Sequence, residues 1–199
     1  MKILFISLGC DKNLADSEEM LGLLTGNGHE IVDSEEEADA IVINTCCFIH
    51  DAKEESVNTI LEMAEYKKNG TCKILIVTGC MAQRYKEEIT EEIPEVDAVL
   101  GTTSYGDIVK ALNEAEAGHV FQEFKDINAL PEDSGRRVIT TGGHFGYLKI
   151  AEGCDKHCTY CIIPSLRGKF RSVPEERLLK QAEYMASQGV RELILVAQE

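Results

Sequence analysis

The chain has 199 residues, of which 44% are hydrophobic, and its 20 basic and 35 acidic residues give a net charge of −15. This length is enough for one domain and part of another. The sequence has no apolar run long enough for a membrane-spanning helix, and residues 2–7 predict a strand rather than an export signal. We therefore expect a cytoplasmic protein, in which the eight cysteines serve as metal ligands rather than as disulfides.

The charge is unevenly distributed along the chain. Residues 1–143 contain 12 basic and 28 acidic residues, which gives a net charge of −16. Residues 144–199 contain 8 basic and 7 acidic residues, which gives a net charge of +1. An acidic N-terminal region is a poor electrostatic match for a phosphate backbone, so nucleic-acid binding is disfavoured. The charge suits a basic protein partner, although solubility alone would also explain it.

Short apolar runs alternate with helical patterns along the first 117 residues. The apolar runs predict strands at residues 2–7, 29–32, 40–44, 73–78 and 96–100. Apolar residues at helical spacing predict helices from Asp16 to Gly26 and over residues 51–68, 83–90 and 108–117. Small polar residues and early acids at Asp16–Glu19 suit a helix N-terminus. This alternation predicts an α/β fold, with a mostly parallel, doubly wound sheet.

Residues 121–143 contain Pro131, Asp133, Ser134 and two adjacent glycines with little apolar period, and we interpret them as a linker. A strand at 146–151, a cysteine-rich loop, a helix that starts near Pro174 and ends at Gln188, and a strand at 192–197 follow. This order is typical of the opening of a β/α barrel, which needs about 250 residues when complete.

These patterns predict three parts. Residues 1–120 form a doubly wound domain, residues 121–143 a linker, and residues 144–199 the first part of a second domain. Because the last part is too short for a whole barrel, we expect the chain to be a fragment.

Cys154, Cys158 and Cys161 follow Gly153 in the spacing C-x₃-C-x₂-C. Soft thiolates select iron–sulfur clusters or zinc, and a structural zinc site usually has four ligands. His157 is poorly placed as a fourth ligand because it directly precedes Cys158. A four-iron cluster held by three cysteines leaves one iron open for a non-protein ligand. The motif therefore favours such a cluster, with a zinc site completed by His157 or unrelated buried thiols as the alternatives.

Cys10, Cys46 and Cys80 share one position in the pattern, since each lies just past the end of an apolar strand. In an open parallel sheet, ligands bind at the carboxyl ends of the strands. Neighbouring strands lie about 4.8 Å apart, so three sulfurs on adjacent strands can span one cluster. Gly9 and Gly79 allow the backbone to approach closely. The alternative is that small thiols simply pack well at strand ends.

We interpret the two remaining cysteines as structural. Cys47 is expected to point away from Cys46 in an extended chain. Cys72 lies at the start of a strand, at the opposite end of the sheet from the other cysteines.

The two cysteine triads together resemble the methylthiotransferase branch of the radical S-adenosylmethionine (SAM) family, over essentially the whole chain. The motifs that carry the resemblance are Gly9-Cys10, Asn44-Thr45-Cys46, Gly79-Cys80 and the C-x₃-C-x₂-C loop. The resemblance implies two [4Fe–4S] clusters, an auxiliary one on Cys10, Cys46 and Cys80 and a SAM-binding one on Cys154, Cys158 and Cys161. It also implies that Tyr160 lies near the SAM adenine.

Within this branch, four stretches resemble the members that modify an aspartate of a small-subunit ribosomal protein. They are residues 7–18, 146–154, 162–168 and 195–198. Asp11 and Cys47 depart from the usual pattern of these members, and neither is an expected ligand. Family members continue through the barrel to a C-terminal TRAM domain that is absent from this sequence, so we expect the chain alone to be inactive.

The resemblance implies a radical reaction at the unactivated β-carbon of aspartate. One SAM would supply the radical and a second SAM the methyl group, and no side chain of this sequence is expected to act as a catalytic group. Arg167, Lys169 and Arg171 are expected either to contact SAM or the substrate or to form a solvated loop. The sulfur and electron donors stay open.

Two other functions remain as alternatives to modification of a ribosomal protein. One is a tRNA methylthiotransferase, against which the acidic first region and residues 7–13 argue. The other is a non-catalytic iron–sulfur or metal-binding module. The three-cysteine motif argues against an electron carrier, because dedicated ferredoxins usually give each cluster four cysteines.

Overall fold

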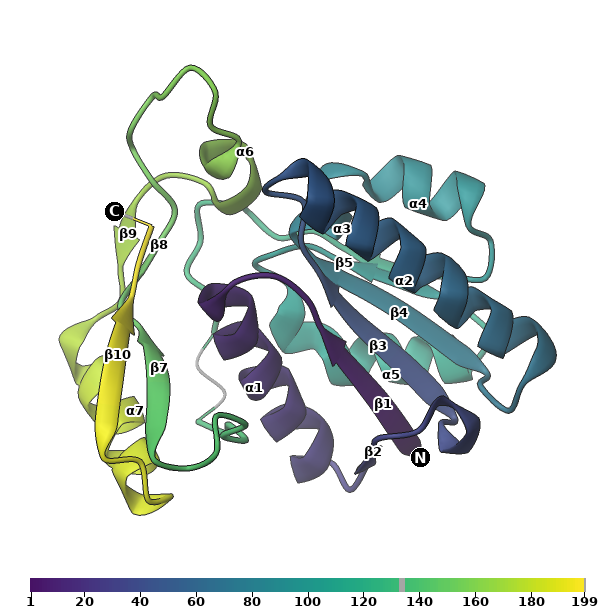
Figure 1. Cartoon of the computed structure of the whole chain (residues 1–199), viewed down its shortest axis with the longest axis horizontal. Helices are drawn as coiled ribbons and strands as arrows, with labels where there is room; N and C mark the ends of the chain where they lie inside the picture. The colour runs from purple at the N-terminus through teal and green to yellow at the C-terminus, as the bar shows by residue number, and fades with distance from the viewer. Residues whose placement is uncertain (133–134, 199) are drawn as a thin grey trace.

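The computed structural model describes residues 1–132 and 135–198 (Figure 1). Asp133 and Ser134, which belong to the expected linker, lie outside the described residues, as does Glu199. The first region contains β1 (Lys2–Ser7), α1 (Asp11–Gly26), β2 (Glu30–Val32), the 3₁₀ helix η1 (Glu35–Glu37), β3 (Ala40–Thr45), α2 (His50–Asn69), β4 (Ile74–Gly79), α3 (Cys80–Arg84), α4 (Lys86–Glu92), β5 (Ala98–Leu100), the 3₁₀ helix η2 (Tyr105–Asp107), α5 (Ile108–Glu116) and β6 (Phe121–Glu123).

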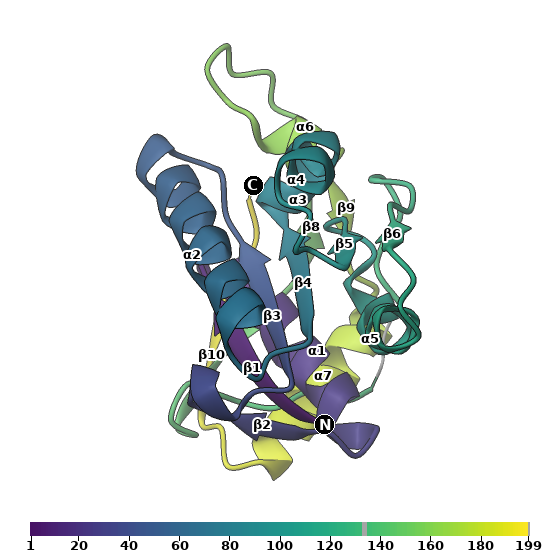
Figure 2. The ribbon, with the colours of Figure 1, turned by 90° about the vertical axis from the view of Figure 1, so that its right-hand side faces the viewer.

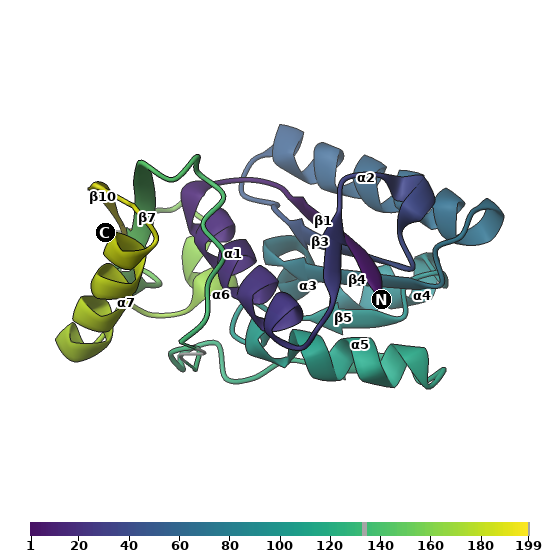
Figure 3. The ribbon, with the colours of Figure 1, turned by 90° about the horizontal axis from the view of Figure 1, so that it is seen from below.

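The six strands of this region form one parallel sheet in the order β2-β1-β3-β4-β5-β6. The central strands β3 and β4 are buried along their whole length, as expected for strands covered on both faces. One core packs α2, α3 and α4 against the sheet, and a second packs α1 and α5 against its other face. Figures 2 and 3 show α2 on one side of the sheet and α1 and α5 on the other. The predicted doubly wound α/β fold is confirmed.

Three local features differ from the sequence prediction. Helix α1 begins at Asp11 rather than at Asp16, because Asp16 and its neighbour Ser17 are buried side chains with tertiary partners and not caps. The predicted helix over residues 83–90 is two short helices, α3 and α4, which are separated at Tyr85 by a non-helical backbone. Strand β6 was not predicted; it adds to the edge of the sheet beside β5.

The second region follows the predicted order of strand, cysteine loop, helix and strand. It contains β7 (Phe145–Lys149), β8 (Ala151–Glu152), α6 (Ile163–Arg167), β9 (Arg171–Ser172), α7 (Glu175–Ser187) and β10 (Glu192–Val196). Strands β7 and β10 pair in parallel on either side of α7 in the chain, as at the opening of a β/α barrel. Strands β8 and β9 form a short antiparallel pair, and α6 was not predicted.

Helix α1 lies between the six-stranded sheet and the second region. Figures 1 and 3 both show it with β1 on one side and β7 with α7 on the other. It packs against β1 and β3 and also against β7. A helix packed on two sides has little surface left for water, which explains why 11 of its 16 residues are buried.

Helix α2 shows how one-sided burial determines the core. Over its 20 residues it buries Ser56, Ile60, Met63 and Ala64, while charged residues cover the solvent side.

No helix in the described parts of the chain is both long and apolar enough to cross a membrane.

We predict that Ile60→Ala lowers the free energy of unfolding by about 2–5 kcal/mol, because it removes a fully buried side chain and leaves a cavity. The adjacent Leu61 is 48% exposed, and Leu61→Ala should cost less than about 1 kcal/mol. Urea denaturation followed by circular dichroism measures both. Equal losses in the two variants would contradict the assignment of the buried face of α2.

Candidate metal centre

A cavity of about 720 Å³ lies between the two regions. Its wall includes all six cysteines of the two triads: Cys10, Cys46, Cys80, Cys154, Cys158 and Cys161. Three of these side chains come from the carboxyl edge of the sheet, and three come from the loop between β8 and α6. The two motifs that the sequence places more than 70 residues apart therefore share one chamber.

The first triad lies where the sheet reverses its strand order. Cys10 directly precedes α1, Cys46 follows β3, and Cys80 opens α3 immediately after β4. Since β1, β3 and β4 are adjacent and parallel, their carboxyl ends meet at one edge. Ser56 of α2 fixes the backbone of Cys46, because its hydroxyl accepts from the Cys46 N–H at 3.0 Å and donates to the Cys46 carbonyl at 2.8 Å. The structure therefore brings these three cysteines together at one edge of the sheet.

Two glycines allow the backbone segments next to the cysteines of the first triad to pack closely together. Gly9 has φ of +95°, and a Cβ there would lie 2.6 Å from the Cβ of Cys46. Gly79 has φ of +94°, and a Cβ there would lie 2.3 Å from Asn44 Oδ1. Any side chain at either position would clash with backbone or short side chains that cannot move away, so glycine is required on both grounds.

The thiols of the first triad differ in exposure. Cys10 is exposed, whereas Cys46 and Cys80 are buried. Burial raises the pKa of the Cys46 and Cys80 thiols, and the Arg167 guanidinium opposes this effect on the pKa of Cys80. Because the thiolate is the form that binds metal, loading this site must release protons.

The second triad lies on a loop whose two ends are pinned together. The Cys154 N–H donates to the Gly168 carbonyl at 3.1 Å, and Gly153 packs so closely that a Cβ there would lie 2.1 Å from the Lys169 carbonyl oxygen. Within the loop, the Cys161 N–H donates to the Cys158 carbonyl at 3.1 Å. The base of the loop is therefore rigid while its thiols face the cavity.

Other residues singled out by the sequence have different positions. Tyr160 lies on the wall of the cavity, but the residue is 90% exposed. His157 is exposed and is not among the lining residues. Of the three basic residues that follow the loop, Arg167 lines the cavity, whereas Lys169 and Arg171 do not.

Cys47 and Cys72 lie in the hydrophobic core beside α2. Burial raises the pKa of Cys47 to about 12, and the Cys72 thiol lies 3.2 Å from the Ile74 carbonyl oxygen, to which it donates. All eight cysteines are described, and none forms a disulfide.

The donor set of each triad consists of three thiols. Across residues 1–132 and 135–198, no group of three or more Cys, His, Asp or Glu forms a site for a single metal ion. Three soft thiolates at each site, with no imidazole or carboxylate among them, match the ligand preference of iron–sulfur clusters.

A network of buried charges lies at the wall of the cavity, where Lys12 and Arg167 are lining residues, and joins the two regions. Asp16 of α1 accepts from Arg167 Nη1 at 2.7 Å and forms an ion pair with Lys149 of β7. Glu152 of β8 lies 2.6 Å from Lys149 Nζ and 3.1 Å from Lys12 Nζ. All five side chains are at most 7% exposed. Charges are almost never buried to this extent unless they are paired.

A separate buried ion pair, between Glu18 and Arg137, extends this interface along α1. Glu18 is fully buried, and its Oε2 accepts from Arg137 Nε at 2.8 Å. Its Oε1 accepts from the Thr140 N–H at 2.7 Å and from the Thr140 hydroxyl at 2.8 Å. The Arg137 guanidinium also donates to the Tyr147 carbonyl of β7 at 2.7 Å.

These ion pairs were not predicted from the sequence, because the acids of α1 also suit the helix dipole. One signal was present. At about 3.6 residues per turn, acids at positions 16, 18 and 19 point in widely separated directions around the helix. A helix that packs against a sheet must then bury some of them.

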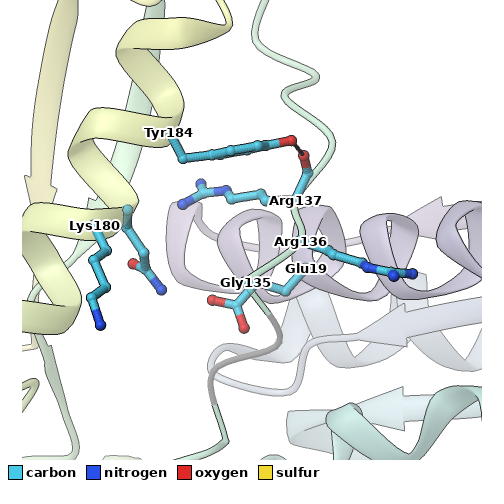
Figure 4. Close-up of a pocket in the computed structure, with 7 residues that line it drawn as sticks. Glu19, Gly135, Arg136, Arg137, Lys180 and Tyr184 are labelled. Atoms are coloured by element: carbon cyan, nitrogen blue, oxygen red, sulfur yellow. Dashed lines mark hydrogen bonds between the residues drawn. The ribbon is translucent and has the colours of Figure 1, made fainter.

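A smaller cavity of about 140 Å³ lies between α1 and α7 (Figure 4). Glu19, Arg137, Lys180 and Tyr184 are among its lining residues, and the Tyr184 hydroxyl donates to the Arg137 carbonyl at 2.6 Å. Its lining contains no cysteine, so it is separate from both cysteine triads.

Known proteins match the chain in both regions. The model of "Uncharacterized protein family UPF0004" matches residues 2–101, and the model of the radical SAM superfamily matches residues 148–199. Proteins named ribosomal protein uS12 methylthiotransferase RimO are similar over the whole chain. The protein from Lachnoclostridium phytofermentans is 65% identical over 199 residues, and the one from Clostridioides difficile is 50% identical over 199 residues.

In both comparisons the match covers 100% of this chain and 45% of the relative, so the chain spans less than half the length of these relatives. The family resemblance expected from the cysteine motifs is confirmed. The chain belongs to protein family UPF0004, and its last part, residues 148–199, matches the radical SAM superfamily.

Proposed function

We propose that this chain forms part of a radical SAM methylthiotransferase that acts on ribosomal protein uS12. One observation carries the proposal: the two cysteine triads line a single cavity between the two regions. A reaction that needs two clusters at one substrate requires this arrangement. The relatives are named as uS12 methylthiotransferases, and their substrate is proposed for this chain by similarity over 45% of their length.

In this proposal each triad holds one [4Fe–4S] cluster. Cys154, Cys158 and Cys161 would hold the one that binds SAM, and Cys10, Cys46 and Cys80 would hold the auxiliary one. When bound, the clusters and SAM supply the radical and the methylthio group. The chain's own residues bind these groups, fix their separation and exclude water.

The modified position would be the β-carbon of an aspartate, where a methylthio group replaces one hydrogen. No side chain can remove that hydrogen as a proton near neutral pH, so the residues around the cavity are expected to position groups and not to act as bases. Phe48 and Ile49 line the cavity beside Cys46 and are more than half exposed. Their apolar surface would shield a radical from water once the substrate covers it.

The net charge supports a protein substrate. The chain carries −15, which would attract a basic partner such as a ribosomal protein and repel tRNA. We also propose a cytoplasmic location, where ribosomal proteins occur and thiols stay reduced. Tyr160 is the proposed contact for the SAM adenine, since its exposed ring lies on the cavity wall.

Iron content after anaerobic reconstitution tests whether both triads hold clusters. We expect about eight irons per chain, and about four in each of the variants Cys154→Ala and Cys80→Ala, because each loses one cluster. Cys72→Ala is the matched control: this thiol lies in the core and should leave the iron content unchanged. Low iron with bound zinc, or full iron in Cys80→Ala, would favour a metal-binding module instead.

A test of the substrate needs a chain of the relatives' full length. Incubation with SAM, a sulfide source and a reductant should add a methylthio group to an aspartate of uS12, as seen by mass spectrometry of its peptides. Cys10→Ala should abolish the product, whereas Cys72→Ala should retain it. Modification of tRNA without modification of uS12 would contradict the proposal and favour a tRNA methylthiotransferase.

A further inference from the structure

Arg167 reaches from the second region to the first triad. It is the last residue of α6, yet its side chain is 3% exposed and lines the cavity together with Cys80. Helix α6 rests on the sheet edge, because Thr102 after β5 donates its hydroxyl to the Leu166 carbonyl at 2.8 Å. A cation of one region is thus built into the wall that holds the cysteines of the other.

The position of this guanidinium is fixed from two sides. Its Nη1 donates to Asp16 Oδ2 at 2.7 Å, and its Nη2 donates to Asn13 Oδ1 at 2.5 Å. Asn13 in turn donates to the carbonyls of Leu8 and Thr45, at 2.9 Å each. Leu8 directly follows β1, and Thr45 is the last residue of β3. Asn13 therefore connects Arg167 through hydrogen bonds to the backbone segments that carry Cys10 and Cys46.

Cys80 shares the same acceptor. Its thiol lies 3.9 Å from Asn13 Oδ1, the atom to which Arg167 donates. The thiol and the guanidinium therefore meet at one buried oxygen. When the thiol loses its proton to bind iron it can no longer donate, whereas the N–H groups of Arg167, one of which donates to the same oxygen, can donate to the thiolate.

We propose that Arg167 is a positioning residue for the cluster on Cys10, Cys46 and Cys80. Its buried positive charge stabilises the anionic thiolates across the interface between the two regions. The midpoint potential at this triad then depends on a residue of the radical SAM segment. This inference rests on the proposed function, in that it takes the first triad to bind a cluster.

The physical reason is the low dielectric around the guanidinium. One-electron reduction adds one negative charge at the triad, and a fixed positive charge beside it favours that charge. Hydrogen bonds to the sulfurs and net charge are among the factors that set the potential of such clusters. Removing Arg167 should therefore make reduction harder.

The test uses a chain in which Cys154, Cys158 and Cys161 are all replaced by Ala, so that iron can bind only at the first triad. The reconstituted chain is titrated with dithionite and followed by electron paramagnetic resonance. In Arg167→Gln, we expect the equilibrium constant for reduction to fall at least tenfold, which is a shift of about 59 mV to more negative potential.

Two further variants make the test specific. Arg167→Gln with Glu152→Gln removes one buried charge of each sign, so the interface keeps its charge balance if the single variant unfolds. Because Glu152 does not line the cavity, the potential should still fall. Arg171→Gln is the matched control: Arg171 donates to the Arg167 carbonyl at 3.1 Å, does not line the cavity, and should leave the potential unchanged.

The outcomes separate this inference from the proposed function. A negative shift in the Arg167 variants, or loss of their iron while circular dichroism shows them folded and Arg171→Gln keeps its iron, supports the role of Arg167. Iron at about four per chain with an unmoved potential in both Arg167 variants overturns it and leaves the proposed function intact. A parent chain that binds no iron at the first triad overturns both.

Discussion

The arrangement of the two regions depends on the buried ion pairs that the acidic residues of α1 form. Asp16 pairs with both Lys149 and Arg167, and Glu18 pairs with Arg137. Removing one partner of a buried pair costs about 3–5 kcal/mol, because the other charge is left without compensation. An apolar interface tolerates small rotations, whereas paired charges with fixed hydrogen bonds do not. The ion pairs therefore favour one docked orientation of the second region.

That orientation decides what the cysteines can do. Each triad is positioned locally, the first by three adjacent strand ends and the second by a loop pinned at its base. Neither local arrangement requires the triads to face each other. They share a cavity because α1 packs against the sheet on one side and against β7 on the other. Helix α1 begins directly after Cys10, so the helix that docks the second region also carries the start of the metal site.

Much of the fold and the cysteine positions follow from local patterns. The apolar runs that end at Cys10, Cys46 and Cys80 are strands, and their convergence follows from parallel pairing alone. The partners of the α1 acids could not be predicted, because Asp16 and Lys149 lie 133 residues apart and Glu18 and Arg137 lie 119 apart. Short elements such as β6 and α6 were also missed, since three to five residues carry too little periodicity. Their formation depends on the neighbours that they contact.

The central claim is that the two triads face one cavity, and thiol cross-linking of the iron-free chain tests it most directly. Cys10 and Cys158 are both exposed and both line this cavity. A short bifunctional thiol reagent, applied anaerobically to dilute protein, should join Cys10 to a cysteine of the second triad within one chain, as identified by peptide mass spectrometry. Cross-links confined to pairs within each triad would contradict the account.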